Sequence, residues 1–288
     1  TGIVEDNDLW IGPYDKGINS MTEQEFNDVI TRVENIYKPI VREKGGDLHV
    51  DRKWEDGTVN ASAQRFGEKW VVNMYGGLAR HETITGDGFA MVVCHELGHH
   101  IGGLPKKKMF WSTTWAANEG QADYFGSLKC MKKYVRGDDN VAIVEKMDVP
   151  TFVTKKCQES FTTQDDLAIC QRLAMAGLSL GNLFKVLKKL DKDLKFDTPD
   201  PKKVDTTDSN HPAPQCRLDT YFAGALCDKL TTDDVSETDI NKGVCVRERS
   251  EAPIKTRPLC WFKPNDKGGG GGGGGFPFPF PMPKPPKS

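Results

Sequence analysis

Apolar side chains recur every three or four residues in several stretches of the chain, which predicts amphipathic helices. The first helix follows Thr22 and Glu25, which have the spacing of a capping box, and it ends at Gly45-Gly46. The same periodicity predicts four further helices, over residues 87–101, 114–135, 167–190 and 214–230. Stretches typical of strands cover residues 48–54, 59–66 and 70–75. The pattern therefore predicts an α+β protein with a small sheet.

The other segments lack such periodicity. Residues 191–210 form a long polar loop, and residues 231–265 read as an irregular, cysteine-containing extension. Eight consecutive glycines at 268–275 precede a stretch rich in proline. We expect one domain over residues 1–265, followed over 266–288 by a flexible linker and a disordered tail. A docking peptide is the alternative interpretation of that tail.

Charge and hydropathy exclude two classes of protein. The formal net charge is −2 over 288 residues, which argues against a nucleic-acid-binding protein that relies on a basic surface. Apolar runs fall short of the ~18 residues that a membrane-spanning helix needs, so we expect no transmembrane segment.

Eight cysteines indicate a compartment. They occur without a Cys-x2-Cys pair, and the sequence starts at Thr1 rather than at a methionine. We interpret them as disulfides in a secreted or periplasmic protein whose signal peptide has been removed; buried free thiols in a cytosolic protein are the alternative. A helix over 214–230 would hold Cys216 and Cys227 too far apart to bridge each other. The other pairings remain open.

The segment from Cys94 to His100 contains a His-Glu-x-x-His motif. On a helix, His95 and His99 project from one face, so that both imidazoles can bind one zinc ion. Glu96 lies beside them, placed to take a proton from a zinc-bound water. His100 points away from His99, and we expect it to be a supporting or surface residue rather than a ligand.

A third metal ligand lies farther along the chain. The metzincin pattern fails, because Pro105 stands where its third histidine belongs. Glu119, twenty residues after His99, resembles the glutamate that a second helix supplies in gluzincins. That resemblance implies zinc binding by His95, His99 and Glu119, with Asp123 holding the other ring nitrogen of His95. Asp123 as the ligand in place of Glu119 remains the alternative.

A second motif, His211-Pro212 followed by Arg217, narrows the resemblance. Together with the segments 60–63, 70–78, 95–100 and 118–123, which occur in the same order, it resembles the signatures of M48-type metallopeptidases. This family includes the CAAX prenyl proteases and the HtpX-like proteases. The likeness covers roughly residues 22–230.

The resemblance implies a zincin-like (minigluzincin) fold. In such a fold a small mixed sheet with an edge strand lies over the His-Glu-x-x-His helix and the glutamate-donating helix, here with a disulfide-stapled C-terminal region. His211 would donate a hydrogen bond to the oxyanion, and Arg217 would touch the reaction intermediate or pair with a carboxylate. The edge strand would pair with the substrate backbone through Asn60, Ala61, Ser62 and Ala63. Asn60 also begins a glycosylation sequon, but a glycan would block this edge, so we expect none.

These features together predict a zinc-dependent endopeptidase with one Zn²⁺ per chain, acting on protein or peptide substrates. Glu96 would serve first as general base and then as general acid. One alternative is a catalytically weak binding or chaperone-like envelope protein on a zincin scaffold. Another is a disulfide-stapled interaction protein in which the histidine motif is incidental.

Overall fold

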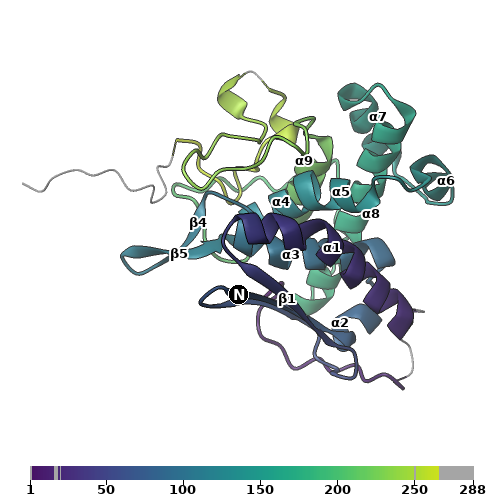
Figure 1. Ribbon diagram of the computed structural model, residues 1–288. Helices are drawn as coiled ribbons and strands as arrows, with labels where there is room; N and C mark the ends of the chain where they lie inside the picture. The colour runs from purple at the N-terminus through teal and green to yellow at the C-terminus, as the bar shows by residue number, and fades with distance from the viewer. Residues whose placement is uncertain (1, 16–18, 20, 250, 266–288) are drawn as a thin grey trace, which may run out of the picture.

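A computed structural model describes residues 2–15, 19, 21–249 and 251–265. It combines helices with two small sheets, as predicted for an α+β protein (Figure 1). The linker and tail predicted for 266–288 lie outside the described residues.

The larger sheet has three strands, β1 (Asp47–Lys53), β2 (Ala61–Phe66) and β3 (Lys69–Tyr75). Their order is β1-β3-β2, with β1 parallel and β2 antiparallel to β3. The sheet is therefore mixed, and β2 lies at one of its edges. The strand predicted from residue 59 begins two residues later, at Ala61.

Two long helices, α1 (Glu23–Glu43) and α3 (Gly86–Ile101), pack against this sheet and against each other (Figure 1). The predicted capping box of α1 is present, because Thr22 Oγ1 accepts from the amide of Glu25 and the Glu25 carboxylate accepts from the amide of Thr22. α3 is buried from residue 88 to its end, as expected for a helix whose surface is largely apolar. A short helix, α2 (Gly76–Arg80), follows β3.

The helix predicted over 114–135 is wrong at its start. Its first four residues belong instead to a hairpin of β4 (Lys106–Met109) and β5 (Ser112–Ala117), which projects from the body in Figure 1. Helix α4 (Glu119–Phe125) begins only after Asn118, whose side chain caps it by accepting from the amide of Gln121 at 2.9 Å. The helix then continues through a π-helical segment (Gly126–Met131) into α5 (Lys132–Val135).

Four more helices complete the helical part. Two of them, α6 (Asn140–Glu145) and α7 (Thr151–Ser160), were not predicted, and α9 (Pro214–Leu226) ends four residues before the predicted end at residue 230. The long helix α8 (Gln164–Leu187) is, against expectation, apolar and long enough to cross a membrane by length and composition alone. Because 78% of its apolar 18-residue stretch is buried inside the protein, α8 is explained as a core helix.

Two segments without long regular elements lie along α9. Residues 191–210, which contain neither helix nor strand, bond to the chain near the C-terminus through Val204 N to Leu259 O at 3.0 Å and Asp208 N to Trp261 O at 2.8 Å. We call residues 228–265 the C-terminal region; as far as the structure describes it, its only helical elements are two one-turn 3₁₀ helices (Arg247–Arg249 and Pro253–Lys255). The long loop therefore has a structural partner.

All eight cysteines are paired in four disulfides: Cys94–Cys130, Cys157–Cys170, Cys216–Cys260 and Cys227–Cys245. The prediction that Cys216 and Cys227 do not bridge each other is confirmed, because α9 separates them. Four disulfides fit an oxidising, extracytoplasmic location.

Candidate metal centre

Three predicted metal ligands converge at the centre of the molecule. His95 and His99 lie one turn apart on α3, and their Nε2 atoms are 3.1 Å apart. Glu119, the first residue of α4, places Oε2 3.3 Å from Nε2 of His95 and 3.4 Å from Nε2 of His99. All three side chains are fully buried. The geometry therefore gives three ligand atoms that could hold one metal ion.

The hydrogen bonds of the two imidazoles leave both Nε2 lone pairs directed at this centre. His95 donates from Nδ1 to Oδ1 of Asp123 at 2.7 Å, and His99 donates from Nδ1 to the carbonyl of Ala117 at 2.7 Å. Two nitrogen lone pairs and a carboxylate oxygen that face one another require a proton or a cation between them. A His₂Glu donor set of this kind suits Zn²⁺.

The electrostatics of the cluster also favour a bound cation. Burial opposes a charge on His95, but the carboxylates of Asp123, Glu119 and Glu96 outweigh it and raise the pKa of His95 to about 9. Burial would raise the pKa of Glu119, yet the two histidines hold it well below its usual range. Three buried carboxylates thus attract positive charge to the histidine nitrogens.

Glu96 is the unpartnered acid of the site. Its side chain is fully buried, and neither carboxylate oxygen has a hydrogen-bond partner among the residues that the structure describes. Burial is the largest cause that raises the pKa of Glu96 above its usual value. A buried carboxylate costs free energy unless it is paired. This side chain therefore suits a base that acts on a water molecule or substrate at the centre.

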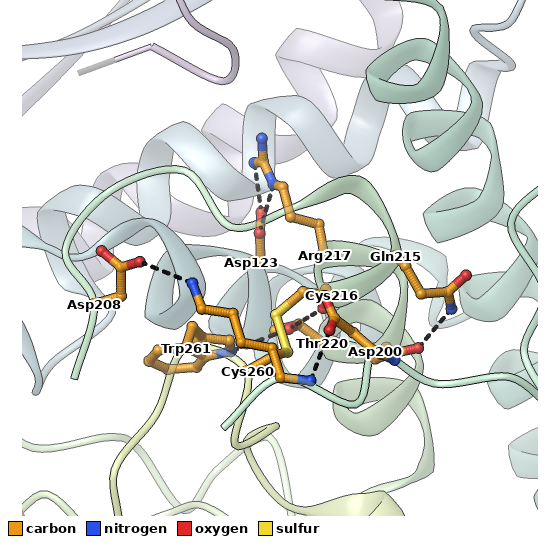
Figure 2. Close-up of a disulfide and its surroundings, with 11 residues drawn as sticks. Asp123, Asp200, Asp208, Gln215, Cys216, Arg217, Thr220, Cys260 and Trp261 are labelled. Carbon is orange, nitrogen blue, oxygen red and sulfur yellow. Dashed lines mark hydrogen bonds and ion pairs between the residues drawn. A yellow bond between two sulfur atoms is a disulfide. The ribbon is translucent and has the colours of Figure 1, made fainter. Parts of the chain in front are cut away.

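Asp123 is the hub of a buried network that supports the first histidine. Besides accepting from His95, it forms a two-point ion pair with Arg217, with Nε to Oδ2 at 2.8 Å and Nη2 to Oδ1 at 2.9 Å (Figure 2). Tyr221 donates to the same Oδ1 at 2.6 Å. Burial would raise the pKa of Asp123, but Arg217 and His95 lower it to about 2. Of the two roles considered for Arg217, pairing with a carboxylate is the one the geometry shows.

Tyr221 is the residue of this network that the sequence analysis missed. It stands one turn after Arg217 on α9, and its spacing from that arginine is the signal that could have found it.

Close packing sets the positions of the two ligand-bearing helices. A Cβ on Gly98 would lie 2.9 Å from the carbonyl oxygen of Ala122, so only glycine lets α3 approach α4 this closely. Cys94, the residue before His95, is bonded to Cys130 in the segment that continues α4. On its other side α4 meets Trp261, whose ring would overlap a Cβ at Gly120.

His100 occupies a different place from the one expected. It follows His99 directly and, as expected, is not one of the three ligand candidates, but it is buried rather than on the surface. It stacks on the rings of Trp70 and Trp115, at ring-centroid distances of 5.6 and 4.8 Å. Its Nε2 donates to the carbonyl of Val71, and Arg65 donates to its Nδ1. Burial lowers the pKa of His100 to about 3, so this ring is a neutral packing residue.

His211 lies beside the ligand cluster, with its Nε2 3.5 Å from Oε2 of Glu119. That nitrogen donates to the carbonyl of Gly2 at 2.6 Å. Burial is the largest cause that lowers the pKa of His211, which favours the neutral ring. The structure thus brings the imidazole next to the ligands with its donor on a peptide carbonyl.

Of the segment predicted to pair with substrate, Asn60 to Ala63, the last three residues belong to β2, an edge strand of the sheet, and Asn60 directly precedes it. Residues 2–4 of the same chain pair with it there, which nothing in the sequence indicated. The Asn60 side chain accepts from the amide of Val4 and donates to its carbonyl, at 3.3 and 3.2 Å.

Comparisons with protein-family models, with curated proteins and with solved structures find no match to this chain.

Proposed function

We propose that this protein is a zinc-dependent endopeptidase that acts in an extracytoplasmic compartment, secreted or periplasmic. The observation that carries the proposal is the convergence of His95, His99 and Glu119 beside the unpartnered carboxylate of Glu96. The resemblance of the sequence motifs to M48-type peptidases of the gluzincin group supports the same proposal.

A zinc ion held by His95, His99 and Glu119 would supply a Lewis acid that polarises a substrate carbonyl and lowers the pKa of a water molecule. Glu96 would accept a proton from a water molecule at the site, whose oxygen would add to the carbonyl carbon of the scissile bond. Glu96 then delivers the proton to the departing amine as the C–N bond breaks. One water is consumed, and no covalent bond to the protein forms.

The remaining residues of the site bind and orient. Nε2 of His211 is a donor for a peptide carbonyl oxygen, where negative charge develops during the addition of water. Asp123 fixes the tautomer of His95, and Arg217 balances the charge of Asp123. Substrate binding by the edge from Asn60 to Ala63 belongs to this proposal, and it requires that this edge become free.

The test is hydrolysis of casein by the zinc-loaded protein and by its Glu96→Gln variant, with the metal content of both measured. We expect the variant to keep one zinc per chain and to lose activity by about 10²–10⁴-fold, the range for removal of a general acid–base group. Glu34→Gln is the matched control, because Glu34 on α1 is also buried but pairs with Lys38 of the same helix and with Arg52 on β1. A Glu96→Gln variant as active as the unchanged protein would rule out the mechanism.

A further inference from the structure

Residues 2–4 lie along the edge of β2 that faces away from β3, with a bridge at Gly2 and a bend at Ile3 and Val4. Gly2 forms an antiparallel bridge with Ser62, and the amide of Ile3 donates to the carbonyl of Ala61 at 3.0 Å. The amide of Val4 donates to the side-chain oxygen of Asn60, and the side-chain nitrogen of Asn60 donates to the carbonyl of Val4. The segment therefore takes the position that an added peptide strand would take on an open sheet edge.

The carbonyl groups of this segment point at the residues assigned to the reaction. The Gly2 carbonyl accepts from His211, and the Ile3 carbonyl accepts from Nη1 of Arg217. His211 Nε2 is in turn 3.5 Å from Glu119. Both donors contact main-chain oxygens, so they would hold the backbone of any peptide that lay in the same register.

The side chains of the segment indicate what the site accepts. Ile3 is fully buried and Val4 is 7% exposed, whereas the next six residues, from Glu5 to Trp10, are exposed. A Cβ at Gly2 would lie 2.9 Å from Oδ1 of Asn60 and 3.0 Å from the carbonyl of Ala61, so this position takes only a very small residue. A cavity of about 120 Å³ lies where the chain leaves the edge, between Val4, Phe184 and His211.

We propose that the β2 edge, His211 and Arg217 form a peptide-binding site that residues 2–4 occupy as a tethered ligand. The site takes an extended peptide with glycine followed by two β-branched aliphatic residues. Residues 2–4 must leave before another peptide can pair with β2, so the segment holds the site in an inhibited form. This inference rests on the proposed function, because the same site would receive the substrate.

The test releases the segment from the folded protein. A recognition sequence for a specific protease is inserted between Asp8 and Leu9, where the chain is exposed, and the purified protein is cut and passed through gel filtration. The control carries the same insertion between Thr232 and Asp233, inside the loop closed by Cys227–Cys245, where cutting releases no fragment. Both are made with Glu96→Gln as well, so that binding is measured without hydrolysis.

The binding probe is a fluorescent peptide with the sequence of residues 2–8, compared with a scrambled peptide in polarisation measurements. We expect the cut protein to bind it about tenfold more tightly or better than the uncut protein, because a tethered competitor acts at a high effective concentration. The control should bind equally before and after cutting. The inference would be overturned if the fragment eluted together with the protein. It would also be overturned if the fragment departed and peptide binding did not rise.

Casein hydrolysis by the proteins that retain Glu96 separates this inference from the proposed function. A gain in peptide binding without hydrolysis of any substrate leaves the tethered ligand standing and contradicts the peptidase. Hydrolysis at one rate before and after the fragment departs contradicts the tethered ligand and leaves the peptidase standing. We expect both binding and hydrolysis to rise on cutting.

Discussion

The helix pair α3–α4 and the C-terminal region differ in what holds their residues in place. The helix pair carries the candidate metal ligands on regular backbone, with the contact at Gly98 and the Cys94–Cys130 bond holding the two helices together. The C-terminal region, where the structure describes it, has only two single turns of 3₁₀ helix. Two disulfides attach it to Cys216 in α9 and to Cys227 directly after α9, and it packs Trp261 on α4. Helical hydrogen bonds therefore align the residues of the site, whereas disulfides hold an irregular segment in contact with α4.

Of the changes proposed here, Asp123→Asn should lower the free energy of unfolding and the zinc affinity of the helix pair the most. The change leaves Arg217 fully buried without its counterion, which costs about 3–5 kcal/mol in the free energy of unfolding. It also removes the anion behind His95, so zinc affinity should fall by about 10–100-fold. Urea unfolding and competition with a chromogenic chelator measure the two quantities.

Asp87→Asn is the matched control for this prediction. Asp87 forms the same two-point pair with Arg172, at 2.8 and 2.9 Å, but Arg172 also keeps Asp138 at 2.7 Å and lies away from the ligands. We expect a smaller loss of stability and unchanged zinc affinity. If Asp123→Asn bound zinc as tightly as this control, the network around His95 would have no role in metal binding.

Removal of disulfides should separate the two regions. By the loop-entropy relation, replacing either Cys94–Cys130 or Cys227–Cys245 with alanine pairs costs about 3–4 kcal/mol of unfolding free energy. Only the first pair joins the two ligand-bearing helices, so only its loss should also weaken zinc binding. An equal fall in zinc affinity in both variants would mean that the C-terminal region aligns the site as much as the helix pair does.

The smallest effect, taken per unit of pH, concerns Lys132, which helps to attach the C-terminal region. Lys132 is buried and donates to the carbonyl of Cys227; burial lowers its pKa to about 7. Between about pH 7 and 10 the unfolded chain then binds more protons than the folded one, so this group makes the protein more stable as pH rises. The slope is at most about 1.4 kcal/mol per pH unit for one proton.

Lys132→Met should flatten this dependence between pH 7 and 9, as measured by urea unfolding at each pH. Lys129, whose pKa burial lowers to about 8, contributes a dependence of the same sign that remains in the variant. An unchanged slope in Lys132→Met would show that the ammonium is not the group that titrates.

Local signals predicted much of this fold. The capping box at Thr22 and Glu25 placed the start of α1, and the repeat of apolar residues up to Gly102 placed α3. The spacing of His95 and His99 on one helix predicted that their rings converge, and the resemblance to gluzincins added Glu119, which the structure places with them.

Non-local contacts decided what the sequence could not. Residues 115–117 fit a helical pattern, yet the Ala117 carbonyl accepts from His99 and Asn118 caps Gln121, so the helix starts later. The environment of His100 depends on Trp70 and Trp115, which only the fold brings to it. The occupation of β2 by residues 2–4 joins positions about 60 residues apart, and no periodicity records such a contact.

The central claim is that His95, His99 and Glu119 bind one zinc ion. Its most direct test is the metal content of the purified protein after dialysis, by elemental mass spectrometry, beside the Glu119→Ala variant. We predict one zinc per chain in the unchanged protein and none retained stoichiometrically in the variant. Absence of stoichiometric metal from the unchanged protein, or full retention by the variant, would contradict the assignment.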